Sequence, residues 1–226
     1  MVKIINKGVN IHEKSDYFFH FRFPVFHVNT ASFAGAEVRD PVDPSCLNAK
    51  VIDLKYPMQQ LWVEHAWWTR SLIVSTLSDL KDKDVVLARL LKNQEDLGTI
   101  IKSYYGEEEG NKFTALLKEH ILIAGKIIDA ARRGDQPNIN KFNKEWVQNA
   151  DEIVAFLTSA NPYWSKKVLT EMFYTHLKLT TDEVIDRLKG DWVGDVRTAD
   201  TNETHLIHMG DILTEGIVKQ FPEKFR

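Results

Sequence analysis

Residues 61–68 read LWVEHAWW and residues 116–123 read LLKEHILI, so a leucine and a Glu-His pair recur 55 positions later in the chain. A further histidine, His176, follows His120 after another 56 positions. Self-similarity at a nearly fixed period indicates a structural unit that is repeated. The sequence therefore places His65, His120 and His176 at the same point of three successive units.

The second half of each unit carries two polar residues three positions apart, which share one face if the segment is a helix. These pairs are Asn93 with Asp96, Asn149 with Glu152, and His205 with His208. Duplication of a hairpin explains recurrence without any function. The exchange of an amide and a carboxylate for two histidines in the third unit favours a functional role, because a purely structural pair had no need to change.

From about Met58 onward, apolar residues recur with the period of an α-helix. Several of these stretches end at glycine, as at Gly106, Gly134 and Gly190, which is typical of helix C-termini. The predicted helices cover about residues 58–79, 86–105, 109–133, 139–159, 165–189 and 201–220. We predict an all-α fold, an antiparallel helical bundle of about six helices built from three repeated helical hairpins. The hairpins are expected at about 58–110, 111–166 and 167–222. A short array of stacked hairpins is the alternative arrangement.

Residues 1–57 form a separate N-terminal arm in this interpretation, since they are rich in proline and show no helical period. Within the arm, Phe18–Val28 reads FFHFRFPVFHV, whose partial alternation predicts a short edge strand interrupted by Pro24. So many phenylalanines are expected to pack on the bundle or on a neighbouring subunit. Packing on a neighbouring subunit would make the chain a homo-oligomer. The alternative is an ordered extension without any chemistry.

The recurring polar residues predict a buried metal site. Burying an imidazole or amide without a partner costs about 1–3 kcal/mol, so the helices must pair these groups or give them to a ligand. Imidazole and carboxylate are ligands for iron and zinc, and helical bundles hold such ions between facing helices. The predicted ligands are His65, Asp96, His120, Glu152, His176, His205 and His208. Asp211, three residues after His208 on the same face, is a further candidate.

This site predicts an iron- or zinc-binding bundle that acts as an oxidoreductase or as a sensor. Two alternatives remain open at this point. In the first, the histidines, amides and carboxylates form a hydrogen-bond network without metal, in a protein that is not an enzyme and that serves structure or assembly. In the second, a small-molecule pocket lies between helices and is lined by Trp62, Trp68 and Tyr174.

Composition excludes several other classes of function. The formal net charge is -3, and the 29 basic and 32 acidic residues are interspersed, so no basic stripe is available for nucleic acid. Cys46 is the only cysteine, which rules out an intramolecular disulfide and a thiolate zinc cluster. No apolar run approaches the ~18 residues of a membrane span, and no glycine-rich nucleotide loop is present. We expect a soluble, cytoplasmic protein without a nucleotide cofactor.

Five segments carry a resemblance to a known family. They are LWVEHAWWTR, LKNQEDLG, YYGEEEGNKFTALLKEHI, WVQNADEIVAFLTSANPYW and GIVKQFPEKF. Over about residues 56–226 the chain resembles a family of small bacterial proteins without an established function, whose members are often catalogued as acetylglutamate kinase or synthase. The chain lacks the phosphate-binding loops and the alternating strands and helices that such a kinase needs, so the resemblance does not imply this activity. At the level of fold alone, the chain is similar to hemerythrin-like and ferritin-like bundles.

Overall fold

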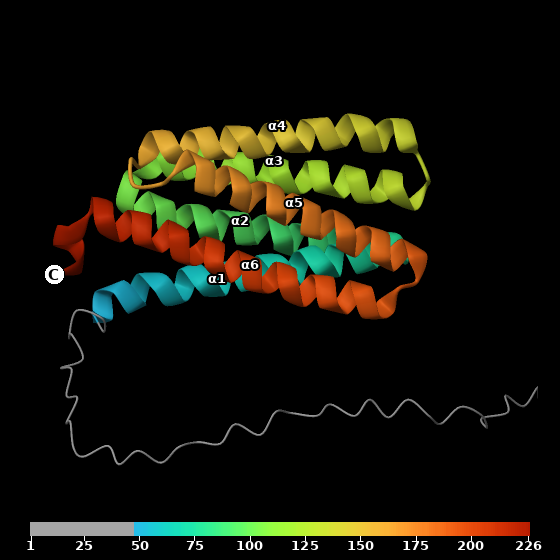
Figure 1. Cartoon of the computed structure of the whole chain (residues 1–226), viewed down its shortest axis with the longest axis horizontal. Helices are drawn as coiled ribbons and strands as arrows, with labels where there is room; N and C mark the ends of the chain where they lie inside the picture. The colour runs from blue at the N-terminus through green and yellow to red at the C-terminus, as the bar shows by residue number, and fades with distance from the viewer. Residues whose placement is uncertain (1–47) are drawn as a thin grey trace, which may run out of the picture. The chain divides into compact units, whose positions relative to one another are not determined.

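A computed structural model describes residues 48–226, and this part of the chain forms six α-helices that lie side by side (Figure 1). The helices are α1 (Ala49–Leu77), α2 (Lys83–Tyr105), α3 (Glu107–Arg132), α4 (Gln136–Ala160), α5 (Lys166–Lys189) and α6 (Trp192–Gln220), followed by a short 3-10 helix, η2 (Pro222–Phe225). No strand occurs in residues 48–226, so the prediction of a helical bundle is confirmed there. The predicted edge strand at Phe18–Val28 and the predicted assembly contact of the arm lie outside the described residues.

The helix ends follow local sequence signals. Gly134 and Gly190, which come just after α3 and α5, have φ values of 66° and 73°. Such left-handed backbone is easily adopted by glycine and ends a helix. At the other end, Asp135 and Ser165 accept hydrogen bonds from backbone N–H groups in the first turns of α4 and α5. These caps explain why most of the predicted boundaries lie within a few residues of the observed ones.

Two helices, α1 and α6, begin well before their predicted starts. α1 starts at Ala49, with Asn48 as its N-cap, and continues through Pro57. The prediction placed a boundary at this proline, because proline lacks the N–H that the helix interior uses, but packing of the following turns keeps the helix continuous. α6 starts at Trp192 instead of near Thr201. Its first turns include polar and small residues that are buried, so they carry no apolar period for a sequence-based prediction to detect.

The packing brings the odd-numbered helices together in the interior. α1, α3 and α5 contact one another, although each is separated from the next in sequence by an even-numbered helix. α2 contacts α1 and α3, α4 contacts α3 and α5, and α6 contacts α5 and α1, so the first and last helices lie side by side (Figure 1). Large buried side chains fill the space between them, among them Trp62, Leu97, Phe113, Ile153, Phe173 and Leu213. The three histidines of the sequence repeat belong to the three helices that meet in this core.

No helix in residues 48–226 is long and apolar enough to cross a membrane.

α6 passes very close to the indole ring of Trp164, which is 3% exposed, and a Cβ added at Gly216 would lie 1.9 Å from Nε1 of that ring. The absence of a side chain at Gly216 is therefore a condition for the observed approach of α6 to the segment between α4 and α5.

Candidate functional site

Three histidines from three helices meet in the core of the bundle. His65 of α1, His120 of α3 and His176 of α5 are 2%, 2% and 3% exposed. The ring centroids of His65 and His176 are 5.5 Å apart, and those of His120 and His176 are 6.0 Å apart. We refer to these three residues as the histidine cluster.

The ring of His120 is fixed by Asn149 of α4. Nδ1 of His120 lies 2.8 Å from Oδ1 of Asn149, and Nδ2 of the same amide donates to the carbonyl of Leu116 at 3.1 Å. Because the amide nitrogen donates to the Leu116 carbonyl, the amide oxygen faces the imidazole and accepts a hydrogen bond from it. Nδ1 of His120 therefore carries the hydrogen, and Nε2 carries the lone pair.

His176 has the same arrangement with Asn202 of α6. Its Nδ1 lies 3.0 Å from Oδ1 of Asn202, whose Nδ2 donates to Oε1 of Glu183 at 2.9 Å. The same Nδ2 also donates to the hydroxyl of Thr180 at 3.3 Å. These donations again orient the amide oxygen toward the imidazole, so His176 also carries its hydrogen on Nδ1.

His65 differs from the other two histidines. Nε2 of Gln94 donates to the carbonyl of Leu90 at 2.8 Å and lies 3.3 Å from Nδ1 of His65. The same nitrogen also donates to Oδ1 of Asn93 at 3.0 Å, so both of its hydrogens are used and the contact with His65 does not fix the tautomer of that ring. Oε1 of Gln94 is buried without a partner in residues 48–226, which indicates that this amide is less well satisfied than Asn149 or Asn202.

Several other polar atoms near the histidine cluster have no hydrogen-bond partner within residues 48–226. They include Nε2 of His120, Nε1 of Trp62 and Nε1 of Trp146. The two indoles pack against the cluster, with ring centroids 5.4 Å between Trp62 and His65 and 5.1 Å between Trp146 and His120. Leaving a buried polar group unpaired costs about 1–3 kcal/mol, and native proteins contain few such groups. The core around the histidine cluster therefore holds polar groups that the described side chains do not satisfy.

Burial keeps the three imidazoles neutral. Desolvation lowers the pKa of His120 to about 3 and that of His176 to about 4, and for His120 the neighbouring His176 lowers the pKa further. The pKa of His65 also falls well below its usual 6.5, chiefly through burial and then through the charge of the other two rings. A neutral imidazole is the form that binds metal ions.

The structure separates four of the other predicted ligands from this cluster. Asp96 forms an ion pair with Lys92 on the surface of α2, and Glu152 is exposed and accepts a hydrogen bond of 2.9 Å from Gln148. His208 is exposed on α6. Asp211 accepts a hydrogen bond of 2.7 Å from Gln59 and forms an ion pair of 3.3 Å with Lys55, both from α1.

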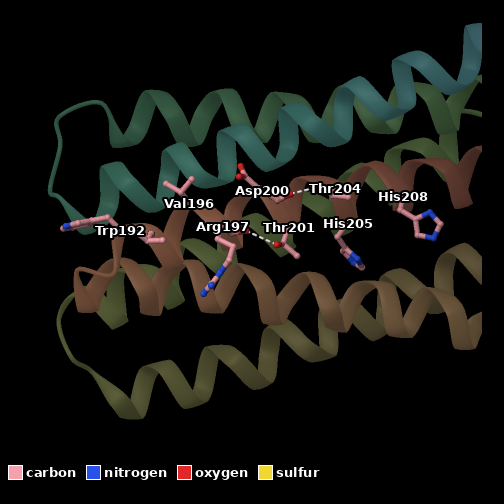
Figure 2. A pocket seen from close by; sticks show the side chains of 9 residues that line it. Trp192, Val196, Arg197, Asp200, Thr201, Thr204, His205 and His208 are labelled. Atoms are coloured by element: carbon pink, nitrogen blue, oxygen red, sulfur yellow. Dashed lines mark hydrogen bonds between the residues drawn. The ribbon is translucent and has the colours of Figure 1, made fainter. Parts of the chain in front are cut away.

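His205 of α6 is half-buried where this helix packs against α5. Its Nε2 donates to the carbonyl of Met172 at 2.8 Å, so Nδ1 is the ring nitrogen that carries the lone pair. Figure 2 shows His205 and His208 among the side chains of α6 that line a surface hollow of about 1040 Å³. Neither residue belongs to the histidine cluster.

One backbone contact recurs in the helix pairs α1–α2, α3–α4 and α5–α6. In each pair, a side chain of the second helix hydrogen-bonds to the carbonyl four residues before the cluster histidine of the first helix: Asn93 to Leu61 at 2.9 Å, Asn149 to Leu116 at 3.1 Å, and His205 to Met172 at 2.8 Å. The imidazole contacts do not follow the same spacing. His176 pairs with Asn202, one turn before His205, so Asn202 and Gln94 are site residues that the sequence interpretation missed.

A group of four charged residues next to the cluster, with two buried acids and two half-buried arginines, was also missed. Arg70 of α1 donates to both carboxylate oxygens of Asp195 at 2.8 and 2.9 Å, and Arg187 donates to the same carboxylate at 2.8 Å. Glu183 lies 3.6 Å from Arg70 through Oε2, which has no hydrogen-bond partner in residues 48–226. Glu183 follows His176 by two helical turns and so lies on the same face of α5. This spacing is the feature of the sequence that could have identified Glu183. Asn202 joins the two groups through its bonds to His176 and Glu183.

The two acids of this group differ in their pKa. Burial raises the pKa of Glu183 to about 7, and the hydrogen bond from Asn202 and the charge of Arg70 only partly offset this effect. Burial also acts to raise the pKa of Asp195, but the hydrogen bonds and charges of Arg70 and Arg187 outweigh it and lower that pKa below its usual 3.8. Asp195 is thus a fully paired anion, whereas Glu183 is an incompletely paired acid.

Among residues 48–226, no group of three or more His, Cys, Asp or Glu side chains is positioned so that it could hold a metal ion as it stands. No protein-family model, no curated protein and no solved structure matches the chain. The chemistry of the histidine cluster must therefore be argued from its own atoms.

Proposed function

We propose that this chain is a metal-binding helical bundle and that the three imidazoles of the histidine cluster are the ligands of a zinc or iron ion. One observation carries the proposal. Nε2 of His120 is buried and has no partner among residues 48–226, and it bears the lone pair because the hydrogen on Nδ1 is donated to Asn149. Metal-binding histidines are usually oriented in this way, by an oxygen acceptor on the other ring nitrogen. A bound iron would supply redox chemistry, as in an oxidoreductase or a sensor, and a bound zinc would supply a Lewis acid.

The proposal retains three of the seven ligands predicted from sequence. Asp96, Glu152 and His208 are left out because they lie on the surface of even-numbered helices. His205 is left out because it lines the surface hollow along α6 and is not one of the three histidines that meet in the core. The remaining donor set consists of neutral nitrogen ligands only, which suits zinc and iron better than magnesium or calcium.

Metal binding requires a modest movement of the rings. With metal–nitrogen distances of about 2.0–2.1 Å and a tetrahedral angle, ring centroids lie about 5 Å apart. The observed separations are 5.5 Å for His65 with His176 and 6.0 Å for His120 with His176. The rings of these two pairs must therefore approach by less than about 1 Å, the rings of His65 and His120 must come equally close to each other, and all three must turn their Nε2 atoms inward. His65 must also carry its hydrogen on Nδ1, and if the Gln94 amide reorients, its Oε1, which has no partner in residues 48–226, is the acceptor available for this hydrogen.

Metal analysis tests the proposal. The full chain, produced without a histidine tag, is stripped with a chelator, offered Zn²⁺, Fe²⁺ or Co²⁺ in turn, and freed of excess ions. We expect about one ion per chain by elemental analysis for at least one metal. With Co²⁺ we also expect visible absorption bands of a tetrahedral complex. If no metal is retained under any of these conditions, the proposal is wrong.

Two matched variants locate the site. His176→Leu removes a cluster ligand and should abolish retention of the ion, whereas His208→Leu changes an exposed histidine on α6 and should leave retention unchanged. The opposite result, with the ion lost only in His208→Leu, would place the metal along α6. Circular dichroism of both variants shows whether the bundle has remained helical.

A second candidate is a metal-free bundle in which the histidine cluster only fixes the packing of the helices. The observation that favours it is that Gln94, Asn149 and Asn202 each reach Nδ1 of a cluster histidine. A network of this kind specifies one arrangement of helices when its members are satisfied. Under this candidate no metal is retained, and removal of both partners of a pair costs little stability.

We also propose that the bundle consists of three antiparallel hairpins derived from one ancestral hairpin. The recurring carbonyl contacts of Asn93, Asn149 and His205 support this origin, as does the meeting of the first helix of each hairpin in the core. Limited proteolysis tests the hairpin arrangement. Cleavage should occur in the connections between hairpins, near Gly106 and near Pro162, and each fragment should keep its two helices paired.

A further inference from the structure

A cavity of about 390 Å³ lies between α3, α4 and α5, apart from the hollow along α6. Figure 1 shows that the α3–α4 turn and the C-terminal end of α5 lie at the same end of the bundle, which is where residues of the cavity wall are found. The walls are mainly apolar, with contributions from Ile127, Ile128, Val184, Ile185 and Leu188. Pockets that take small organic ligands have volumes of about 300–1,000 Å³ and walls of this kind.

One polar group in the cavity wall lacks a partner. Trp146 of α4 lines the cavity, is 2% exposed, and has no hydrogen-bond partner for its Nε1 within residues 48–226. An indole N–H can only donate, and in a buried place it is stabilised by an acceptor. A ligand that brings an acceptor to this position therefore gains a hydrogen bond that the described side chains do not supply.

The remaining wall indicates the charge of the ligand. None of the described residues that line the cavity is charged, and the other polar side chains are those of Gln136, Thr180 and Thr181. The hydroxyl of Thr181 donates to the Leu177 carbonyl of its own helix. A charged ligand would lose its hydration here without gaining an ion pair, so an uncharged ligand is favoured.

We propose that this cavity binds an uncharged, largely apolar small molecule that carries one hydrogen-bond acceptor, and that Nε1 of Trp146 donates to this acceptor. The proposal is independent of metal binding, because it uses none of the imidazole nitrogens. Since the indole of Trp146 packs against the ring of His120 at 5.1 Å, the ligand lies one side chain away from the histidine cluster.

A pair of ligands of equal size tests the role of the donor. 2-Acetylnaphthalene has a carbonyl acceptor, and 2-isopropenylnaphthalene has nearly the same shape with a CH₂ group in place of the oxygen. Both are titrated into the full chain by isothermal calorimetry. We expect both to bind, and the ketone to bind about two- to tenfold more tightly, which is the range for one net hydrogen bond. Trp146→Phe removes the donor and keeps an aromatic ring, and it should abolish this difference between the two ligands.

A second variant tests the place of binding. Ala131 lines the cavity, so Ala131→Leu should fill part of it and weaken the binding of both ligands, whereas Ala155→Leu changes an exposed position on α4 and should leave both affinities unchanged. The proposal is overturned if neither ligand binds, if the preference for the ketone survives in Trp146→Phe, or if Ala131→Leu binds like the unmodified chain. Because Ala131 is only half-buried, its variant keeps the test valid even where Trp146→Phe does not fold.

Discussion

Nδ1 of His120 and Oδ1 of Asn149 lie 2.8 Å apart in the core, on two helices that are neighbours in the sequence. Both residues are 2% exposed, so neither can exchange its partner for water. Removal of one partner leaves the other buried and unpaired, which costs about 1–3 kcal/mol, whereas replacement of both by apolar groups is close to neutral.

Asn149→Leu alone is therefore expected to lower the free energy of unfolding of the metal-free chain by about 1–3 kcal/mol. The double variant with His120→Leu should recover most of that loss. Urea denaturation of the two single variants and the double variant gives the coupling energy. Additive losses would show that the hydrogen bond contributes nothing beyond the packing of each side chain.

The ion pair between Arg70 and Asp195 should matter far more than one on the surface. The Asp195 side chain is 2% exposed, whereas its partners Arg70 and Arg187 are 25% and 18% exposed. Removing one partner of a fully buried pair costs about 3–5 kcal/mol, and water reaches both arginines here, so Asp195→Asn should destabilise the bundle by about 2–3 kcal/mol. The matched control is Asp96→Asn, which breaks an exposed pair with Lys92 and should cost less than about 1 kcal/mol. Chemical denaturation compares the two, and equal losses would mean that the buried group carries no special stability.

Helix formation could be predicted from sequence because its signals are local. The apolar period, the glycines after α3 and α5 and the capping side chains all act within a few residues of the helix they define. The start of α1 was missed because Pro57 is a local signal against a helix, and the tertiary contacts that override it are distant in sequence.

The composition of the candidate site could be predicted only in part. The repeat identified the three histidines, but Asp96 was grouped with Asn93 because residues three apart share a face. At about 100° per residue, such residues differ by about 60° around the axis, which is enough to bury Asn93 and leave Asp96 at the surface. Asn202 was missed because the pairing of α5 with α6 depends on how far the two helices slide along each other, and spacing within one chain does not reveal that.

The stability of the metal-free chain should fall as the pH falls below 6.5. The histidine cluster has pKa values lowered by burial, so below the usual value of 6.5 the unfolded chain binds protons that the folded chain does not. Stability is then lost by about 1.4 kcal/mol per pH unit for each such histidine. Glu183 acts in the opposite direction between its usual 4.5 and its raised pKa of about 7, because there the folded chain holds the proton.

The three cluster histidines against Glu183 leave a net difference of about two protons, or about 2.7 kcal/mol per pH unit, between about pH 6.5 and 4.5. Half-buried His205, whose pKa burial also lowers, adds to this loss. Urea denaturation at a series of pH values measures this slope. Glu183→Gln removes the opposing group, so its stability should fall more steeply with acidification than that of the unmodified chain. A stability that stays level from pH 7 to pH 5 would contradict the burial of neutral imidazoles.

Two glycine variants test how closely α6 packs. A Cβ at Gly216 would lie 1.9 Å from Nε1 and 2.2 Å from Cδ1 of Trp164, and this indole is itself buried, so it cannot move aside without disturbing the core. Overpacking of this kind costs about 1–3 kcal/mol, and Gly216→Ala should lower the melting temperature accordingly.

Gly125→Ala in α3 is the matched control, because a Cβ there meets nothing within 4 Å in residues 48–226. It should stabilise the chain by about 0.5–1 kcal/mol, since alanine favours a helix interior over glycine. Thermal unfolding followed by circular dichroism separates the two. If Gly216→Ala were as stable as Gly125→Ala, α6 would have to lie farther from Trp164 than described, since only extra space there removes the collision.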